Sequence, residues 1–142
     1  MNGKIYAAIV VLFSILLIVI VAFTIFQLMP AKTLGLLTFN EDCCRIETPI
    51  VKAGEEVIYT VSAYKKYNLE VTVSRHLIDG YVFSYAPFTV SNTEGLIERT
   101  IRVPVGEFTP PGIYRVKTIY TYELFLRHIN YVHWTEEFEV IK

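Results

Sequence analysis

An uncharged apolar segment near the N-terminus constrains this chain more than any other feature of its sequence. Residues 5–26 form a run of 22 residues without a charge, and Ser14 and Thr24 interrupt its apolar character. At a helical rise of about 1.5 Å per residue, such a run extends about 33 Å, enough to cross a hydrocarbon core of about 30 Å. We therefore predict a membrane-spanning helix over residues 5–28, after a short tail at residues 1–4.

A cleaved secretory signal is the alternative for this segment, because Lys4 precedes it as a charged flank would. However, the apolar core of a signal has about 7–15 residues, and the residues after Phe26 lack the small-x-small pattern of a cleavage site. We therefore favour a retained anchor. Lys4 and the amino terminus are positive, whereas acidic residues accompany Lys32 and Arg45 beyond the span. This predicts a single-pass cell-membrane protein with a cytoplasmic N-terminus and an extracytoplasmic C-terminal domain.

The 113 residues from Pro30 onward are enough for one domain with a single hydrophobic core. The whole chain carries 13 Lys and Arg residues against 14 Asp and Glu residues. Neither sign forms a cluster of more than a few residues. Nucleic-acid binding requires a basic surface that neutralises phosphates, so we do not expect it here.

The second half of the sequence alternates apolar and polar side chains with a period of two, which predicts β-strands. Asp79-Gly80 supplies the turn of a predicted hairpin. Strands are predicted at residues 57–63, 69–74, 81–85, 96–103, 114–122 and 133–141, with further short ones at 34–39 and 46–51. Seven or eight short strands without an amphipathic helix indicate an all-β fold, an immunoglobulin-like antiparallel β-sandwich. We place this domain at residues 46–142, after a juxtamembrane linker at residues 29–45 that includes the first short strand.

Tyr114 follows the tight corner Pro110-Pro111-Gly112 at the start of a predicted strand. Two interpretations stay open. It forms a tyrosine corner, in which the phenol bonds back to the backbone of the preceding loop, or it is an ordinary half-buried strand residue.

A series of turn and strand residues runs through most of the chain after the apolar segment. It comprises Cys44, Arg45, Thr48, Pro49, Val51, Gly54, Val103, Pro104, Pro111, Gly112, Tyr114, Tyr122, Asn130, Phe138 and Val140. This series resembles a group of small phage-encoded proteins that join an N-terminal membrane anchor to an immunoglobulin-like domain. The resemblance implies action at a host envelope, for example in superinfection exclusion or lysis. The cysteine expected before Asn130 is absent, so no disulfide of Cys43 or Cys44 carries over.

Cys43 and Cys44 are the candidate reactive thiols of the chain. A bond between sequence neighbours would close a strained eight-membered ring, and ordinary disulfides join Cα atoms about 5 to 6 Å apart, so we expect no bond between them. The favoured interpretation is a pair of reduced, small apolar side chains at a strand edge. The alternatives are a cross-link to another chain and a pair of soft metal ligands.

Histidines could build a copper site with these cysteines, as in the cupredoxin subunits of respiratory oxidases. A Cys-x-x-x-Cys loop after Tyr114 is missing, and His128 and His133 point to opposite faces of a continuous strand. We therefore predict solvated histidines and neither a metal nor another cofactor. The three histidines are His76, His128 and His133.

Sequence motifs of common enzymes are missing, including the nucleophile elbow, His-Glu-x-x-His and Gly-rich phosphate loops. His76 and Asp79 could form an acid–base pair, but a turn aspartate more often caps backbone N–H groups. A solvated acidic face is expected from Glu123, Glu136, Glu137 and Glu139. We expect no catalytic activity and no small-molecule substrate.

Aromatic residues are abundant, with ten Tyr, nine Phe and one Trp. Core packing is the expected role of Tyr81, Phe83, Tyr85, Tyr120 and Tyr122. The segment from Leu124 to Trp134 is apolar over its turn as well as its strands, and loops seldom carry such residues without a partner. We therefore nominate an interaction surface that comprises Leu124, Phe125, Leu126, Tyr131 and Trp134.

The expected function is a non-catalytic binding module beside the lipid bilayer. Its partners would be the outer bilayer interface or another membrane or envelope protein. An accessory subunit of a membrane or filament-base assembly is the alternative. Metal handling by a cupredoxin-like domain is a third, less favoured hypothesis.

Overall fold

The N-terminal unit is helical and apolar. The computed structural model describes residues 3–91 and 94–142, and the chain divides into two units, Met1–Leu34 and Gly35–Lys142. Helix α1 (Gly3–Leu28) has 26 residues, a mean hydropathy of 3.3 over its most apolar window, and no buried side chain between its ends. A four-residue helix, α2 (Ala31–Leu34), follows it. By length and composition α1 can cross a membrane, a test that an N-terminal signal sequence also passes.

The hydroxyl groups of Ser14 and Thr24 are satisfied inside α1. Ser14 Oγ donates a hydrogen bond of 2.9 Å to the carbonyl of Val10, and Thr24 Oγ1 donates one of 2.8 Å to the carbonyl of Ile20. These bonds satisfy the hydroxyls of Ser14 and Thr24, so these two groups do not oppose an apolar environment.

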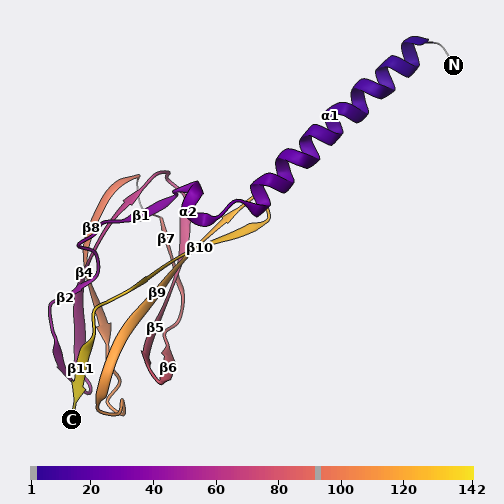
Figure 1. The fold of residues 1–142 in the computed structure, drawn as a ribbon. Helices are drawn as coiled ribbons and strands as arrows, with labels where there is room; N and C mark the ends of the chain where they lie inside the picture. The colour runs from indigo at the N-terminus through magenta and orange to yellow at the C-terminus, as the bar shows by residue number, and fades with distance from the viewer. Residues whose placement is uncertain (1–2, 92–93) are drawn as a thin grey trace. The chain divides into compact units, whose positions relative to one another are not determined.

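The second unit is made of β-strands. In the described residues these are β1 (Leu37–Phe39), β2 (Arg45–Ile46), β3 (Ile50–Lys52), β4 (Glu56–Lys65), β5 (Glu70–Asp79), β6 (Tyr81–Ser84), β7 (Phe88–Ser91), β8 (Gly95–Pro104), β9 (Gly112–Leu124), β10 (Arg127–Trp134) and β11 (Phe138–Ile141). They form two sheets (Figure 1). In the first, β4 pairs with β8 along one edge and with β1 and β2 along the other. In the second, β5 and β9 are central, β6 and β7 flank β5, and β10 and β11 flank β9.

The predicted strand boundaries differ from the structure in three ways. The strand expected at 46–51 is two strands, β2 and β3, and the one expected at 133–141 is the end of β10 followed by β11. Strand β7 was not predicted at all, so the described residues hold eleven strands rather than seven or eight. Strand β3 pairs with β11 in parallel, so the second sheet is mixed. The β unit also begins at Gly35, within the stretch that the sequence suggested as a linker.

One hydrophobic core receives side chains from both sheets. Val57, Tyr59 and Val61 of β4 pack in the same cluster as Tyr114 and Val116 of β9. These residues are almost completely buried and alternate with more exposed neighbours, as the period-two pattern predicted. The central strands were located correctly because their burial follows this alternation.

Tyr114 forms a tyrosine corner. Its hydroxyl donates a hydrogen bond of 2.8 Å to the carbonyl of Pro110, four residues earlier, and only 1% of the residue is exposed. Gly112 fits this corner because a Cβ added there would clash with Oδ2 of Asp79. The structure thus decides between the two interpretations of Tyr114.

Two aromatic residues that were expected in the core lie on the surface instead. Tyr81 and Phe83 belong to β6, an edge strand whose residues are all exposed. Tyr85, just beyond this strand, is half-buried and donates a hydrogen bond of 2.6 Å to the carbonyl of Pro104. The alternation did not predict burial here because β6 lies at the edge of its sheet, although the ring of Phe83 still lies 6.5 Å from that of Tyr114.

Candidate functional site

The turn between β9 and β10 exposes two large apolar side chains. Leu124 pairs with Arg127 in the strand register, so Phe125 and Leu126 alone form the hairpin turn. Both have positive φ angles, 46° and 64°, in a region where glycine and asparagine are favoured. The exposed fractions are 73% for Phe125 and 97% for Leu126. We call Leu124, Phe125 and Leu126 the hairpin tip.

The sequence-predicted interaction surface is only partly contiguous. Leu124 is half-buried beside the two exposed residues, and Trp134 is 45% exposed at the far end of β10. At about 3.3 Å per residue, Trp134 lies roughly 26 Å along the strand from Leu126. The ring of Trp134 instead lies under the ammonium group of Lys117, 5.3 Å from its centroid. The hairpin tip and Trp134 are therefore separate surfaces.

Tyr131 must be removed from the predicted surface. Only 8% of it is exposed, and its hydroxyl accepts a hydrogen bond of 2.9 Å from the backbone N–H of Leu36. The reason is the pleat of β10, which turns Ile129, Tyr131 and His133 inward and their neighbours outward. Tyr131 thus joins the start of the β unit to the strand that leads to the hairpin tip.

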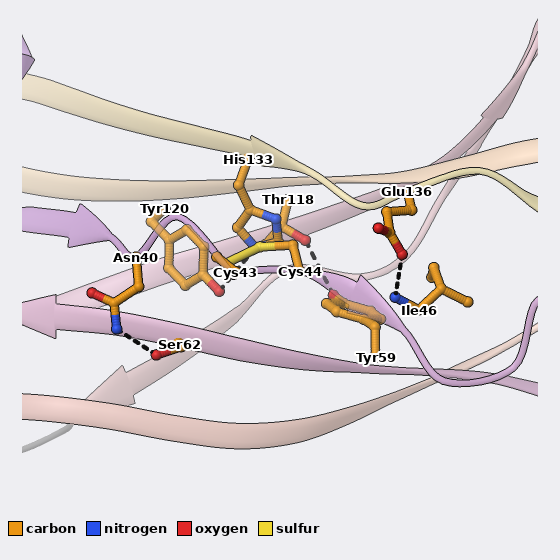
Figure 2. Close-up of a disulfide and its surroundings, with 10 residues drawn as sticks. All are labelled: Asn40, Cys43, Cys44, Ile46, Tyr59, Ser62, Thr118, Tyr120, His133 and Glu136. Atoms are coloured by element: carbon orange, nitrogen blue, oxygen red, sulfur yellow. Dashed lines mark hydrogen bonds between the residues drawn. A yellow bond between two sulfur atoms is a disulfide. The ribbon is translucent and has the colours of Figure 1, made fainter.

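Cys43 and Cys44 form a disulfide, contrary to the expectation of reduced thiols (Figure 2). Their Cα atoms are 3.7 Å apart, and Cys44 has a φ of 71°. The expectation failed because it applied the spacing of ordinary disulfides to neighbours within a tight turn. Cys44 is buried, and the described residues include no free cysteine, so neither candidate thiol is available in this state.

Backbone hydrogen bonds hold the disulfide turn against both sheets. The N–H of Cys44 donates to the carbonyl of Thr60, at 2.9 Å, and its carbonyl accepts from the N–H of Glu136, at 3.4 Å. The carboxylate of Glu136 accepts a hydrogen bond of 3.2 Å from the N–H of Ile46. The turn is therefore part of the packed structure.

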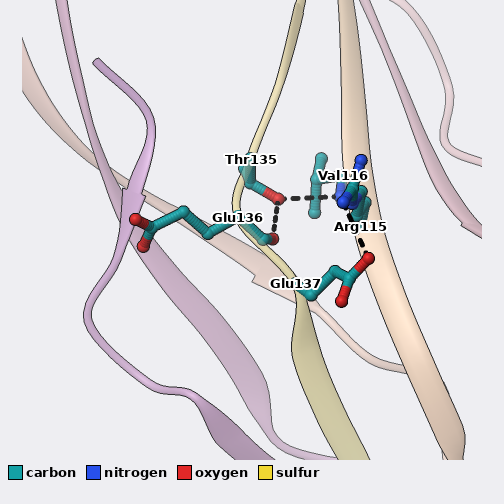
Figure 3. A network of polar contacts seen from close by, with 5 residues as sticks. All are labelled: Arg115, Val116, Thr135, Glu136 and Glu137. Atoms are coloured by element: carbon teal, nitrogen blue, oxygen red, sulfur yellow. Dashed lines mark hydrogen bonds and ion pairs between the residues drawn. The ribbon is translucent and has the colours of Figure 1, made fainter. Parts of the chain in front are cut away.

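The segment that supplies Glu136 is itself fixed by polar contacts (Figure 3). Thr135 Oγ1 accepts a hydrogen bond of 3.0 Å from the N–H of Val116 and donates one of 2.9 Å to the carbonyl of Glu136. Arg115 and Glu137 form an ion pair of 2.7 Å beside them. The side chains of Glu123, Glu136, Glu137 and Glu139 are on the exposed face, as predicted.

His133 is buried, whereas the sequence suggested a solvated histidine. Its ring is 4.9 Å from that of Phe39, and its Nε2 is 3.4 Å from the hydroxyl of Tyr120. Burial, reinforced by the positive charge of Arg75, lowers the pKa of His133 to about 4. His128 points to the opposite face and lies 3.7 Å from Glu123. Among the described residues, no group of three His, Cys, Asp or Glu side chains could hold a metal ion.

A cavity between the two sheets was not predicted. It has a volume of about 80 Å³, and two arginines, Arg75 of β5 and Arg99 of β8, line it among apolar side chains. The sequence contained a signal for Arg75, because it continues the inward-facing alternation of Val71 and Val73. A charged residue at a position where the alternation expects an apolar one is unusual, because charged side chains are rarely buried.

The fold and these sites define a mostly β protein with antiparallel and mixed sheets behind one apolar N-terminal helix. No family model matches the chain, and no curated protein matches it. The chain is similar to the Pseudomonas fluorescens alkylpurine DNA glycosylase AlkC bound to DNA containing an abasic site analog, with 11% identity and a TM-score of 0.46 over 78% of this chain and 33% of that one.

A second solved structure is similar to a comparable extent. It is the CARDB domain of a Pyrococcus furiosus protein in complex with di-metal ions, with 18% identity and a TM-score of 0.46 over 74% of this chain and 87% of that one. The chain spans about a third of the glycosylase. Similarities this low assign no function to it.

Proposed function

We propose that this protein is a single-pass membrane protein whose extracytoplasmic, immunoglobulin-like β-sandwich acts as a non-catalytic binding module. The hairpin tip is its contact surface, and another membrane or envelope protein is its partner. The observation that carries the proposal is the coincidence of exposure and backbone strain at Phe125 and Leu126.

Strain and exposure both disfavour an isolated tip. A left-handed backbone costs about 1 to 2 kcal/mol for each residue other than glycine, and exposed aromatic and aliphatic side chains lower solubility. Asn-Gly would form the same two-residue turn without either penalty. A partner that covers both side chains would return about 25 cal/mol for each Å² of apolar surface removed from water. Phe125 and Leu126 therefore suit a binding surface better than a connecting turn.

Membrane attachment is supported by the composition of α1. The helix is long enough to cross a bilayer and buries none of its side chains in this chain. Lys4 before the span favours a cytoplasmic N-terminus. The shared core of the two sheets and the tyrosine corner at Tyr114 support the immunoglobulin-like arrangement. The resemblance to phage-encoded anchored proteins favours a site of action at a host envelope.

Chain connectivity favours a membrane-bound partner. Leu36, the second residue of the β unit, is hydrogen-bonded to Tyr131. Tyr131 lies five residues from Leu126, on the strand that leads from the hairpin tip. Only residues 29–35 separate α1 from Leu36. A helix held in a bilayer therefore keeps this part of the β unit within reach of other membrane proteins, whatever its orientation.

The test replaces both exposed side chains of the tip in the full chain. We expect Phe125→Ser combined with Leu126→Ser to abolish the higher-order membrane complexes that the unaltered chain forms on a native gel. The matched control is Phe108→Ser, because Phe108 is also an exposed loop aromatic, at 95%. Complexes that survive the double substitution, or that are lost equally in the control, would overturn the proposal.

A further inference from the structure

The cavity between the sheets is apolar on its walls and cationic at two positions. It lies where β7 and β8, which are edge strands of the two sheets among the described residues, carry inward-facing residues. Its volume is about 80 Å³. Its lining comprises Leu37, Phe39, Val61, Ala63, Val71, Val73, Arg75, Phe88, Val90, Ile97, Arg99, Ile101 and Tyr120. This lining contains no carboxylate.

Both arginines occupy positions that the alternation assigns to the interior. Arg75 is in phase with the buried residues Val73 and Leu77 of β5. Arg99 is directly opposite Val61 in the register of β4 and β8. Inward positions of packed sheets are normally apolar, so the half-buried Arg75 requires an explanation, whereas Arg99 is exposed.

The half-buried Arg75 is only partly satisfied by the protein around it. Its Nε is buried and has no hydrogen-bond partner among the described residues. Its guanidinium carbon lies 4.8 Å from the ring centroid of Phe88. Its polar neighbour Tyr59 is neutral, because burial raises the pKa of the phenol. A guanidinium in such surroundings favours an anion, and a carboxylate matches its paired N–H groups.

We propose that this cavity binds a carboxylate carried on an unbranched aliphatic chain, with Arg75 as the anion-binding group. The carboxylate pairs with Arg75, and the first methylenes lie among Val61, Ala63 and Val73. A cavity of about 150 Å³ holds benzene, so one about half that size takes only a few methylenes. The rest of a longer chain leaves between β7 and β8, past Phe88, which is 40% exposed.

Charge and apolar walls together select this ligand over simpler ones. An inorganic anion would make no apolar contact with the cavity walls, and an uncharged alkanol would give Arg75 no negative charge to pair with. Such a ligand can come from solution or, as a free fatty acid, from a bilayer. The site is independent of the hairpin tip and of the function proposed for it.

The test measures binding of octanoate, labelled with ¹³C at its carboxyl carbon, to the full chain in lipid nanodiscs. Empty nanodiscs supply the baseline for partition into lipid. We expect saturable broadening of the carboxyl signal, and a loss of affinity of at least tenfold in Arg75→Met. Octanol should bind at least tenfold more weakly than octanoate. Absence of saturable binding, or equal binding of octanol, would overturn the proposal.

Two further variants separate the cavity from general effects of charge and folding. Ala63→Leu fills the cavity without removing a charge and should also weaken octanoate binding at least tenfold. Arg115→Met removes an exposed cation of β9 outside the cavity and should leave the affinity unchanged. If Arg75→Met does not fold, the site is tested with Arg99→Gln and Ala63→Leu instead. Octanoate affinity that is unchanged in both of these variants refutes the site.

The source of the ligand is resolved by the route of addition. Octanoate is added to the buffer, whereas hexadecanoate is loaded into the nanodisc before the chain is inserted. Saturable broadening of the octanoate signal alone indicates a water-borne carboxylate, and broadening of both carboxyl signals indicates access from lipid. Failure of both ligands to bind contradicts the proposal whether or not the hairpin-tip variants lose their complexes.

Discussion

The two ends of strand β9 show how differently unusual residues are used in this β unit. At its start, Gly112 leaves room for the carboxylate of Asp79, and the hydroxyl of Tyr114 bonds to the carbonyl of Pro110. At its end, Phe125 and Leu126 adopt positive φ angles and remain exposed. At the first end, Gly112 and Tyr114 are both explained by contacts within the molecule. At the second end, the exposed side chains are those that we propose a partner covers.

Truncation at the two ends should give the largest contrast. Tyr114→Ala removes a buried ring and should lower the free energy of unfolding by about 3 to 5 kcal/mol. Phe125→Ala removes an exposed ring and should change it by less than about 0.5 kcal/mol. Denaturant unfolding of the full chain in detergent micelles, followed by the fluorescence of the single Trp134, measures both. Equal losses would contradict the division between an internal and an external role.

Acid should destabilise the fold through the buried His133, near the end of β10. The pKa of His133 is lowered to about 4 from an unfolded value of 6.5. Between these values the unfolded chain binds a proton that the folded chain does not, so the free energy of unfolding decreases as the pH falls, by about 3 kcal/mol in total.

The corresponding variants test this pH dependence. His133→Phe should flatten the profile of unfolding free energy between pH 6.5 and 4, whereas His128→Gln, on the exposed face, should leave it unchanged. Unfolding curves in the same micelles at a series of pH values provide the measurement. A profile that retains its slope in His133→Phe would show that another group causes it.

Relief of the strain at the hairpin tip should stabilise the fold while it removes binding. Phe125→Asn combined with Leu126→Gly places residues suited to positive φ in the turn and should raise the free energy of unfolding by about 1 to 2 kcal/mol. The same variant should lose the membrane complexes. If the variant gains stability but keeps its membrane complexes, the strained turn is not needed for binding, and the proposal loses its main support.

The smallest effect is expected from the hydroxyl of the tyrosine corner. Tyr114→Phe keeps the ring and removes one hydrogen bond, which should lower the free energy of unfolding by about 1 kcal/mol. Tyr81→Phe, at an exposed position of β6, is the matched control and should be neutral within about 0.5 kcal/mol. Identical values for the two variants would mean that the bond to Pro110 adds nothing to stability.

Period-two alternation allowed the central strands to be predicted, because the pleat alone decides which of their side chains are buried. The same alternation could have predicted that Tyr131 is buried, because it lies on the same face of β10 as Ile129 and His133. The apolar character of the whole segment obscured this. Other features depend on the backbone of single turns. The disulfide of Cys43 and Cys44 requires the positive φ of Cys44, which no composition rule reveals. The short strands β2 and β3 likewise depend on which neighbours they pair with.

For the candidate sites, too, the sequence predicted one part and the structure was needed for the rest. The exposure of Phe125 and Leu126 followed from a loop that carries apolar residues, and the structure adds the strain. Arg75 was visible as a charge in an inward phase, but its importance depends on the cavity that β7 and β8 leave between the sheets. Sequence patterns indicate which side of a strand a residue occupies. They do not indicate how far apart two sheets stand.

Photocrosslinking from the hairpin tip tests the central claim most directly. The full chain is produced in cells with p-benzoylphenylalanine at position 126 or, as the control, at position 108, and membrane fractions are compared on gels after illumination. Our account predicts discrete adducts from position 126 in the membrane fraction and none from position 108. No adduct from position 126, or the same adducts from both positions, would contradict it.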